Sequence, residues 1–215
     1  MSRLILVIGN KNYSSWSMRP WVLLTHFKIP FREILIPLFE PGSKEKVLAY
    51  SPSGKVPVLK DGKVTVWESL AICEYIAEKF SKKNIWPRDR AARAAARAVS
   101  SEMHAGFIHL RKLCPMNVRA RKPLSEVPPD VQKDAARIQS LWEDCRKRFG
   151  TGGDFLFGKF SAADAMYAPV IWRFKTYGIK CAGKAHEYMS AMLELPAMKE
   201  WERAAVAEPY VIENR

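Results

Sequence analysis

Cysteine and histidine are scarce in this chain, with four of each among 215 residues. The cysteines, Cys73, Cys114, Cys145 and Cys181, lie 41, 31 and 36 residues apart, so there is no Cys-x-x-Cys pair and no zinc-binding spacing. The histidines are scattered, and no two have the spacing of a chelating pair on one helix face. We therefore expect neither disulfides nor a metal site.

Long apolar stretches are also missing. The apolar run at residues 4–8 ends at Gly9, and the uncharged apolar run at residues 165–172 has eight residues. A membrane-spanning helix needs about 20 such residues, and a signal peptide needs a longer apolar region than the first of these runs. The sequence predicts a soluble, cytoplasmic protein that does not enter a membrane.

Acidic residues are outnumbered, with 22 Asp and Glu against 35 Lys and Arg, which gives a formal charge of +13. Such a surplus is typical of proteins that bind nucleic acids, anionic membranes or small anions. Most of it lies after Phe80, outside the region in which the motifs described below are found. Apolar residues make up 48% of the chain, which is enough for a sizeable core.

The first 80 residues alternate strand and helix patterns. In chain order they predict a strand at 3–8, a helix from about Ser17 with Pro20 in its first turn, a strand at 31–37, a helical turn at 44–49, a hairpin of strands 56–60 and 63–67 joined by Asp61-Gly62, and a helix from Ser69 to Phe80. This order, β-α-β-α-β-β-α, is that of a thioredoxin-like α/β domain.

After a predicted linker at residues 81–89, the patterns are helical only. They predict helices at 90–112, 131–149, 162–177, 185–195 and 196–208. Ser161 and Asp164 have the spacing of a capping box at the start of one of them, and we assign that pair to folding. The predicted organisation is a domain at 1–80, a linker at 81–89 and an all-α C-terminal domain at 90–215.

In a thioredoxin-like domain, chemistry takes place where the first strand meets the first helix. This chain has Ser14-x-x-Ser17 there, with Ser15 between, where a dithiol oxidoreductase has two cysteines. A serine at a helix N-terminus can stabilise the thiolate of another molecule, since one charge-assisted hydrogen bond is worth roughly 1.5–3 kcal/mol. Helix capping is the alternative role for these serines.

Two further motifs could hold a peptide-like ligand. If the Val56-Pro57 bond is cis, the main chain of Val56 can pair with an extended ligand; the alternative is an ordinary proline that begins a strand. Glu68 could hold an ammonium group and Ser69 a carboxylate, although Ser69 is also a natural helix N-cap. Together with the serines, these motifs suggest a zwitterionic, peptide-like thiol.

Three motifs resemble those of the cytosolic glutathione transferase family, and the resemblance extends over essentially the whole chain. They are Ser-Ser-x-x-x-Arg at 14–19, Gly-Lys-Val-Pro-Val-Leu at 54–59 and Glu-Ser at 68–69. The serine-type members, such as the zeta and tau classes, are most similar. Trp16 occupies the place of a cysteine in the zeta pattern, which argues against the maleylacetoacetate isomerase activity of that class.

The resemblance implies that the chain uses glutathione as co-substrate, needs no metal and forms a homodimer. It implies Ser14 as the residue that stabilises the thiolate, with Ser15 as the fallback. It also implies that Val56 pairs with the cysteinyl part of glutathione next to a cis Pro57. Glu68 and Ser69 would then hold the γ-glutamyl end, and Lys55 the glycine carboxylate.

The leading hypothesis is therefore a glutathione transferase whose thiolate attacks an electrophilic, mostly apolar second substrate. That substrate would lie between the Ser14 loop and the helix carrying Met103, His104 and Phe107, beside Trp16. One alternative is a non-catalytic module that binds protein or RNA, supported by the basic run at residues 111–122. Nucleic acid is the less expected partner. Another alternative is a glutathione-dependent isomerase or peroxidase.

Overall fold

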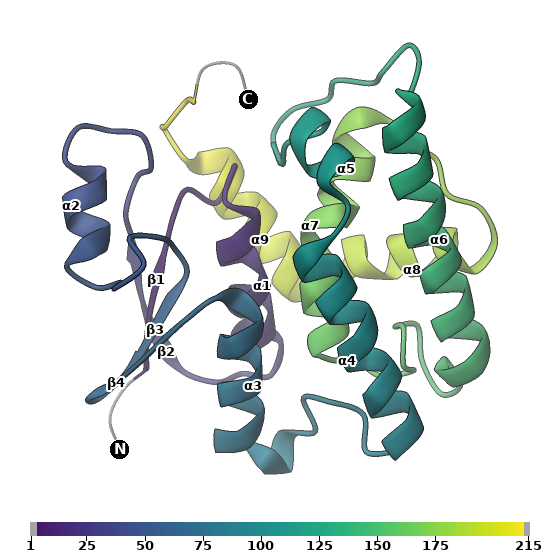
Figure 1. Cartoon of the computed structure of the whole chain (residues 1–215), viewed down its shortest axis with the longest axis horizontal. Helices are drawn as coiled ribbons and strands as arrows, with labels where there is room; N and C mark the ends of the chain where they lie inside the picture. Colours follow the sequence, from purple (N-terminus) through teal and green to yellow (C-terminus); the bar gives the residue numbers. More distant parts are fainter. Residues whose placement is uncertain (1–3, 213–215) are drawn as a thin grey trace.

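A mixed sheet of short strands, flanked by helices, forms the first part of the described chain, here called the sheet part (Figure 1). The computed structural model describes residues 4–212. The elements of the sheet part are β1 (Leu4–Ile8), α1 (Ser15–His26), β2 (Phe31–Leu35), α2 (Ser43–Leu48), β3 (Val58–Asp61), β4 (Val64–Trp67) and α3 (Ser69–Lys79). This order confirms the predicted thioredoxin-like arrangement.

The strands lie in the order β2-β1-β3-β4. β1 and β2 are parallel, joined by α1 as the crossover, whereas β3 is antiparallel to both of its neighbours. Side chains alternate between the two sheet faces along β1. Leu6 and Ile8 belong to the main core that α1 and α3 cover, while Val7 packs with Val47 of α2 in a separate small cluster.

The remaining elements are helical and form the second part, here called the helical part. They are a 3₁₀ turn η1 (Ser81–Lys83) and the helices α4 (Arg90–Ala105), α5 (Ile108–Leu113), α6 (Pro129–Phe149), α7 (Ala162–Tyr177), α8 (Gly183–Glu194) and α9 (Pro196–Ala207). The Ser161–Asp164 capping box that opens α7 is present as predicted. No helix among residues 4–212 is long and apolar enough to cross a membrane.

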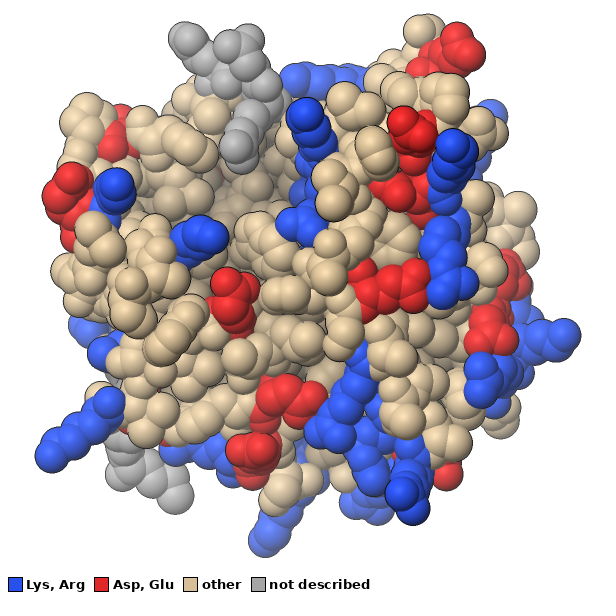
Figure 2. Space-filling view, viewed as in Figure 1, with Lys and Arg blue, Asp and Glu red and all other residues tan. Residues whose placement is uncertain are grey.

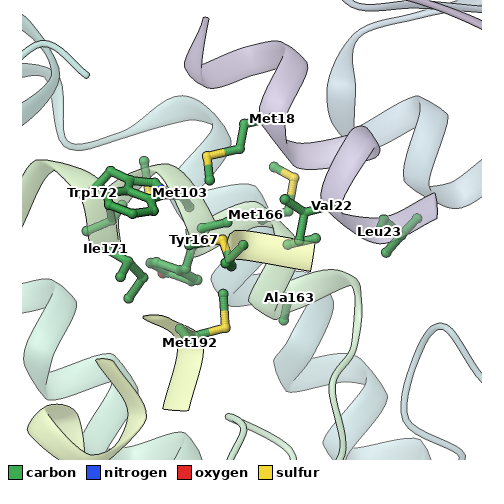
Figure 3. Packing of buried hydrophobic residues seen from close by; sticks show 14 of the residues in the cluster. Met18, Val22, Leu23, Met103, Ala163, Met166, Tyr167, Ile171, Trp172 and Met192 are labelled. Atoms are coloured by element: carbon green, nitrogen blue, oxygen red, sulfur yellow. The ribbon is translucent and has the colours of Figure 1, made fainter. Parts of the chain in front are cut away.

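One hydrophobic core joins the two parts. Figure 3 shows Met18 and Val22 of α1 facing Met166 of α7, with Met103 of α4 beside them. α7 lies at the centre of this core, and nearly all of its side chains are buried. Because α1 packs directly on α7, the start of α1 is fixed by both parts of the molecule.

The first helix begins earlier than the sequence analysis predicted. α1 starts at Ser15, not near Ser17, and the Ser14 side chain accepts a hydrogen bond from the Ser17 backbone N–H. Pro20 therefore lies inside the helix, beyond its first turn. A capping serine at position 14 outweighs the preference of proline for the first turn.

Three other local predictions were also wrong. Val64 pairs with Asp61, so Gly62-Lys63 forms the hairpin turn, with Gly62 at a φ of +60° that suits the first position of a type II′ turn. The helix expected at 90–112 is broken at Gly106, and α5 begins only after it. The side chain of Ser69 does not cap α3, because the N-cap position is occupied by Glu68.

Candidate functional site

The two serines that precede and open α1 lie at the end of the loop that follows β1. Ser14 is 7% exposed, and its hydroxyl donates to Ser17 Oγ at 2.8 Å. Ser17 is fully buried, and its Oγ also accepts from the Gly9 backbone N–H at 3.1 Å. The Ser14 hydroxyl is thus held in place, at the positive end of the α1 dipole.

Ser15 is partly exposed and contacts the helical part. Its Oγ accepts a hydrogen bond from Arg173 Nη2 of α7 at 3.2 Å. Among residues 4–212, no acceptor is found for the proton of the Ser15 hydroxyl. Ser15 can therefore donate to a ligand while a guanidinium polarises its oxygen.

Both serines line a cleft of about 1330 Å³, here called the serine cleft, together with Lys55 and Val56. The Val56-Pro57 bond is cis. Figure 2 shows basic side chains beside a hollow at the boundary between the sheet part and the helical part. Among residues 4–212, the basic residues that line the cleft are Lys44, Lys55, Arg111, Lys112 and Arg173, and the one acidic residue is Glu40. This excess of positive charge favours an anionic ligand.

A smaller hollow of about 420 Å³ adjoins the serine cleft and shares Lys55 and Val56 with it. Pro57 and Glu68 line this hollow. Glu68 has a φ of +70°, and one of its carboxylate oxygens lies 3.7 Å from His104 Nε2. Six of the seven site residues expected from the sequence thus line these two hollows: Ser14, Ser15, Lys55, Val56, Pro57 and Glu68.

Ser69 is the one expected site residue that lines neither hollow. It is fully buried, and its Oγ accepts a hydrogen bond from Arg19 Nη1 at 3.3 Å. The Ser69 hydroxyl thus has a partner inside the protein, and what the start of α3 can offer a ligand is its backbone N–H groups.

Two of the residues expected beside the second substrate are core residues instead. Met103 and Phe107 are buried in the main core, whereas Trp16 and His104 line the serine cleft. The Trp16 ring packs edge-on against His104, with a centroid distance of 5.2 Å. The helical part therefore places the polar side chain of His104 at the cleft and keeps the apolar side chains of Met103 and Phe107 in the core.

Arg19 and Arg111 both contact the ring of Trp16. Their guanidinium carbons lie 4.2 and 4.6 Å from the ring centroid. Burial, together with the positive charges of Arg111 and Arg173, lowers the pKa of Arg19 to about 9. These three guanidiniums gather at the serine end of the cleft, where an added anion would be stabilised electrostatically.

Sequence reasoning missed the contribution of the helical part to the cleft. Arg111 was assigned to a basic surface run, and Arg173 was not singled out. The sequence did contain a signal for Arg173. It is a charged residue that directly follows the apolar run at residues 165–172, in a helix that is apolar on nearly all sides. Arg119 of the same basic run donates to the carbonyls of Glu208 and Tyr210, at 2.6 and 2.7 Å, whereas Lys112, Arg121 and Lys122 are exposed.

Two family models match most of the chain. The family model described as "Glutathione S-transferase, N-terminal domain" matches residues 13–79, and "Glutathione S-transferase, C-terminal domain" matches residues 119–204. Together they cover more than two thirds of the chain.

Relatives and solved structures point the same way. Glutathione S-transferase GstB of Escherichia coli is 23% identical over 91% of this chain and 97% of its own length. A dichloromethane dehalogenase of Methylorubrum extorquens is 38% identical, but over only 27% of this chain and 21% of its own. A probable maleylacetoacetate isomerase of Caenorhabditis elegans is 34% identical over 46% of this chain and 47% of its own.

The fold is shared with a glutathione transferase homologue from Burkholderia, crystallised with bound glutathione, at a TM-score of 0.72 and 20% identity over 96% of this chain and 100% of that one. A tau-class enzyme from mango, Mangifera indica, gives a TM-score of 0.71 at 20% identity, over 95% of this chain and 96% of that one. The chain belongs to the glutathione S-transferase family.

Proposed function

We propose that this chain binds glutathione in the serine cleft and joins it, through its thiolate sulfur, to an electrophilic second substrate. The observation that carries the proposal is that Ser14 and Ser15, at the N-terminus of α1, line the same cation-rich cleft as Lys55 and Val56. The Escherichia coli relative is named a glutathione S-transferase, and the Burkholderia homologue was crystallised with bound glutathione; both support the proposal.

In this proposal, glutathione spans the serine cleft and the smaller hollow. The main chain of Val56 pairs with the cysteinyl part, next to Pro57, and Lys55 faces the glycine carboxylate. Glu68 holds the γ-glutamyl ammonium group. The γ-glutamyl carboxylate is placed at the start of α3, where Arg19 fixes Ser69.

The serines would act on the thiol without forming a bond to it. A free thiol has a pKa of about 8.5, so most of it is protonated at neutral pH. Hydrogen bonds from Ser14 and Ser15 to the sulfur, with the guanidinium of Arg173 beside Ser15, stabilise the thiolate. The Ser14 proton, which points to Ser17 Oγ in this structure, turns to the sulfur when glutathione binds.

In the transfer step, the thiolate sulfur forms a bond to the electrophilic carbon, and the leaving group departs with the electron pair of the bond that breaks. The cleft offers apolar walls to a mostly apolar substrate, at Phe39, Ile108 and Met116. Arg111 and Arg173 stabilise the negative charge that develops on the leaving group. Proximity of thiolate and electrophile supplies the remaining acceleration.

A glutathione-dependent isomerase is the second candidate, because the Caenorhabditis elegans relative is named a probable isomerase. It would use the same thiolate, with glutathione released unchanged. Product analysis separates the two: a transferase consumes one glutathione per product, and an isomerase consumes none.

The experiment is glutathione binding by calorimetry together with turnover of an aryl halide, for the wild type, Ser14→Ala and Ser15→Ala. Ser101→Ala, an exposed serine on α4, is the matched control. We expect the wild type to bind glutathione at millimolar concentration or below. Turnover should fall in Ser14→Ala, in Ser15→Ala or in both, and should stay at the wild-type level in Ser101→Ala. Absence of binding at millimolar glutathione would overturn the proposal.

We further propose that the chain forms a homodimer, as is typical of the family. β4 is the edge strand of the sheet, and it exposes Val64 and Trp67, 45% and 43% accessible. Sedimentation of the wild type should give twice the chain mass, and Trp67→Lys should shift the protein toward the monomer. A wild type that sediments as a monomer at micromolar concentration would refute the dimer.

A further inference from the structure

The loop that carries the serines is held from the far end of the chain. The backbone N–H groups of Lys11 and Asn12 both donate to the carboxylate of Glu208, at 2.6 and 3.1 Å. Glu208 follows α9 directly and is 7% exposed. Figure 1 shows the yellow segment after α9 lying near the start of α1. A residue 194 positions beyond Ser14 thus fixes the loop that ends at Ser14.

Arg119 holds Glu208 and the residues after it in place. Its Nη1 donates to the Glu208 carbonyl at 2.6 Å, and its Nη2 donates to the Tyr210 carbonyl at 2.7 Å. The same Nη2 lies 3.3 Å from the hydroxyl of Tyr13, the residue before Ser14. The Tyr13 hydroxyl also accepts from the Ile212 backbone N–H at 3.2 Å.

The loop makes further polar contacts with the helical part. Asn12 is fully buried; its amide donates to Asn117 Oδ1 at 3.0 Å, and its Oδ1 accepts from the Arg119 backbone N–H at 2.9 Å. Trp201 Nε1 donates to the Lys11 carbonyl at 2.9 Å. Each of residues 11–13 therefore has at least one hydrogen-bond partner that lies more than 100 positions away in the chain.

We infer that Glu208 and Arg119 are positioning residues for the serine hydroxyls, because together they fix residues 11–13 against the helical part. This inference rests on the proposed function of Ser14 and Ser15. Neither Glu208 nor Arg119 lines the serine cleft, so neither touches glutathione or the second substrate. They act through the backbone of residues 11–13, which sets the distance between the serine hydroxyls and the sulfur of glutathione.

The effect on the reaction follows from the geometry of the donors. Two charge-assisted hydrogen bonds fix consecutive N–H groups, two and three residues before Ser14. A neutral amide in place of the carboxylate has a single acceptor oxygen, so one of the two N–H groups loses its partner. A displacement of about 1 Å at a reacting centre can lower a rate by about 100-fold.

The test compares Glu208→Gln with Glu200→Gln, an exposed glutamate of α9. For Glu208→Gln we expect faster hydrogen exchange at Lys11 and Asn12, a higher thiol pKa of bound glutathione, and kcat lower by about 10-fold. KM for glutathione should stay within about twofold, because Lys55, Val56 and Glu68 are untouched. Glu200→Gln should behave as the wild type in all four measurements.

Arg119→Lys and Arg119→Met provide a second, graded test. Lysine keeps the charge but cannot span both carbonyls, so it should restore part of the kcat that methionine loses. Faster exchange at Lys11 and Asn12 with an unchanged thiol pKa and kcat would overturn the inference, because the contacts would then be structural only. So would unchanged exchange in Glu208→Gln.

Failure of the proposed function looks different. In that case the wild type itself binds no glutathione, or binds it without lowering its thiol pKa, whatever the exchange data show. The exchange measurement needs no ligand, so it reports on the contacts of Glu208 in either case.

Discussion

The sheet part and the helical part build opposite walls of the serine cleft in different ways. Every site residue expected from the sheet part lies in one of three short motifs between Ser14 and Ser69. The helical part contributes Arg111 and Arg173 to the cleft wall, and Arg119 and Glu208 behind the serine loop, with no motif among them. Site residues that lie together in one short segment can be recognised in the sequence. Site residues that come together only when distant segments pack cannot.

The two parts also differ in how their polar groups are buried. In the sheet part, Ser14 and Ser17 contact each other and the backbone nearby. In the helical part, Asp164 holds groups at the start of its own helix, whereas Arg173 holds groups from separate segments. Substitutions in the helical part should therefore separate effects on the stability of the fold from effects on the reaction.

The largest expected effect is on stability, at Asp164. Its carboxylate accepts from the backbone N–H groups of Leu156 and Ser161, at 3.0 and 2.7 Å, and from the Ser161 hydroxyl at 2.9 Å. Asp164→Ala leaves these buried donors without a partner, so the free energy of unfolding should fall by about 3 kcal/mol. Urea denaturation measures this free energy of unfolding, and the value for Asp164→Asn should lie between those of the wild type and Asp164→Ala.

Asp144→Ala is the matched control, because Asp144 is exposed and pairs only with Arg148 at 2.9 Å. Its effect should be below about 0.5 kcal/mol. The folded Asp164→Asn protein should keep the wild-type thiol pKa of bound glutathione. A large change in that pKa would show that folding and chemistry are not separable here.

The second effect is on chemistry, at Arg173. Arg173→Met removes the positive charge next to Ser15 and should raise the thiol pKa of bound glutathione, with kcat/KM lower by about 10-fold to 100-fold. Arg203→Met, at an exposed arginine of α9, should leave both unchanged. Equal effects of the two variants would mean that net charge, rather than the Ser15 contact, is what matters.

The smallest effect is a pH dependence at the contact between the two parts. His26 of α1 packs on Phe160 of the helical part, with ring centroids 4.1 Å apart, and burial lowers the pKa of His26 to about 4. The unfolded chain binds a proton on this histidine near pH 6.5. The contribution of neutral His26 to stability is therefore complete above pH 6.5 and is lost as the pH falls toward 4.

His26→Phe removes this titration and keeps an aromatic ring against Phe160. The difference in urea midpoint between wild type and variant should thus shift in favour of the variant between pH 7.5 and pH 5. A difference that stays constant over this range would show that His26 titrates equally in the folded and unfolded states.

The sequence predicted most of the fold, because its signals are local. Strand patterns, the serines at the start of α1 and the Ser161–Asp164 capping box all depend on neighbours within a few residues. The errors occurred where two local preferences compete, as at Pro20 against the cap at Ser14, or where one residue decides a boundary, as Gly106 does between α4 and α5.

The site was predicted less completely than the fold. Ser69 has the sequence of a helix cap, yet its hydroxyl is taken by Arg19, 50 residues away in the chain. Met103 and Phe107 were expected beside the cleft on one helix, but α4 ends before Phe107, and both side chains are buried in the core. Arg173 meets Ser15 only because α1 packs on α7, and no spacing within either helix indicates that packing.

The central claim is that the serines at the start of α1 ionise the thiol of bound glutathione. Its most direct test is a titration of thiolate absorbance for the glutathione complex of the wild type, Ser14→Ala, Ser15→Ala and the double variant. The account predicts a wild-type thiol pKa at least about one unit below the free value of about 8.5, and a return toward that value in the double variant. A wild-type thiol pKa equal to the free value, or a double variant that keeps the lowered value, would contradict it.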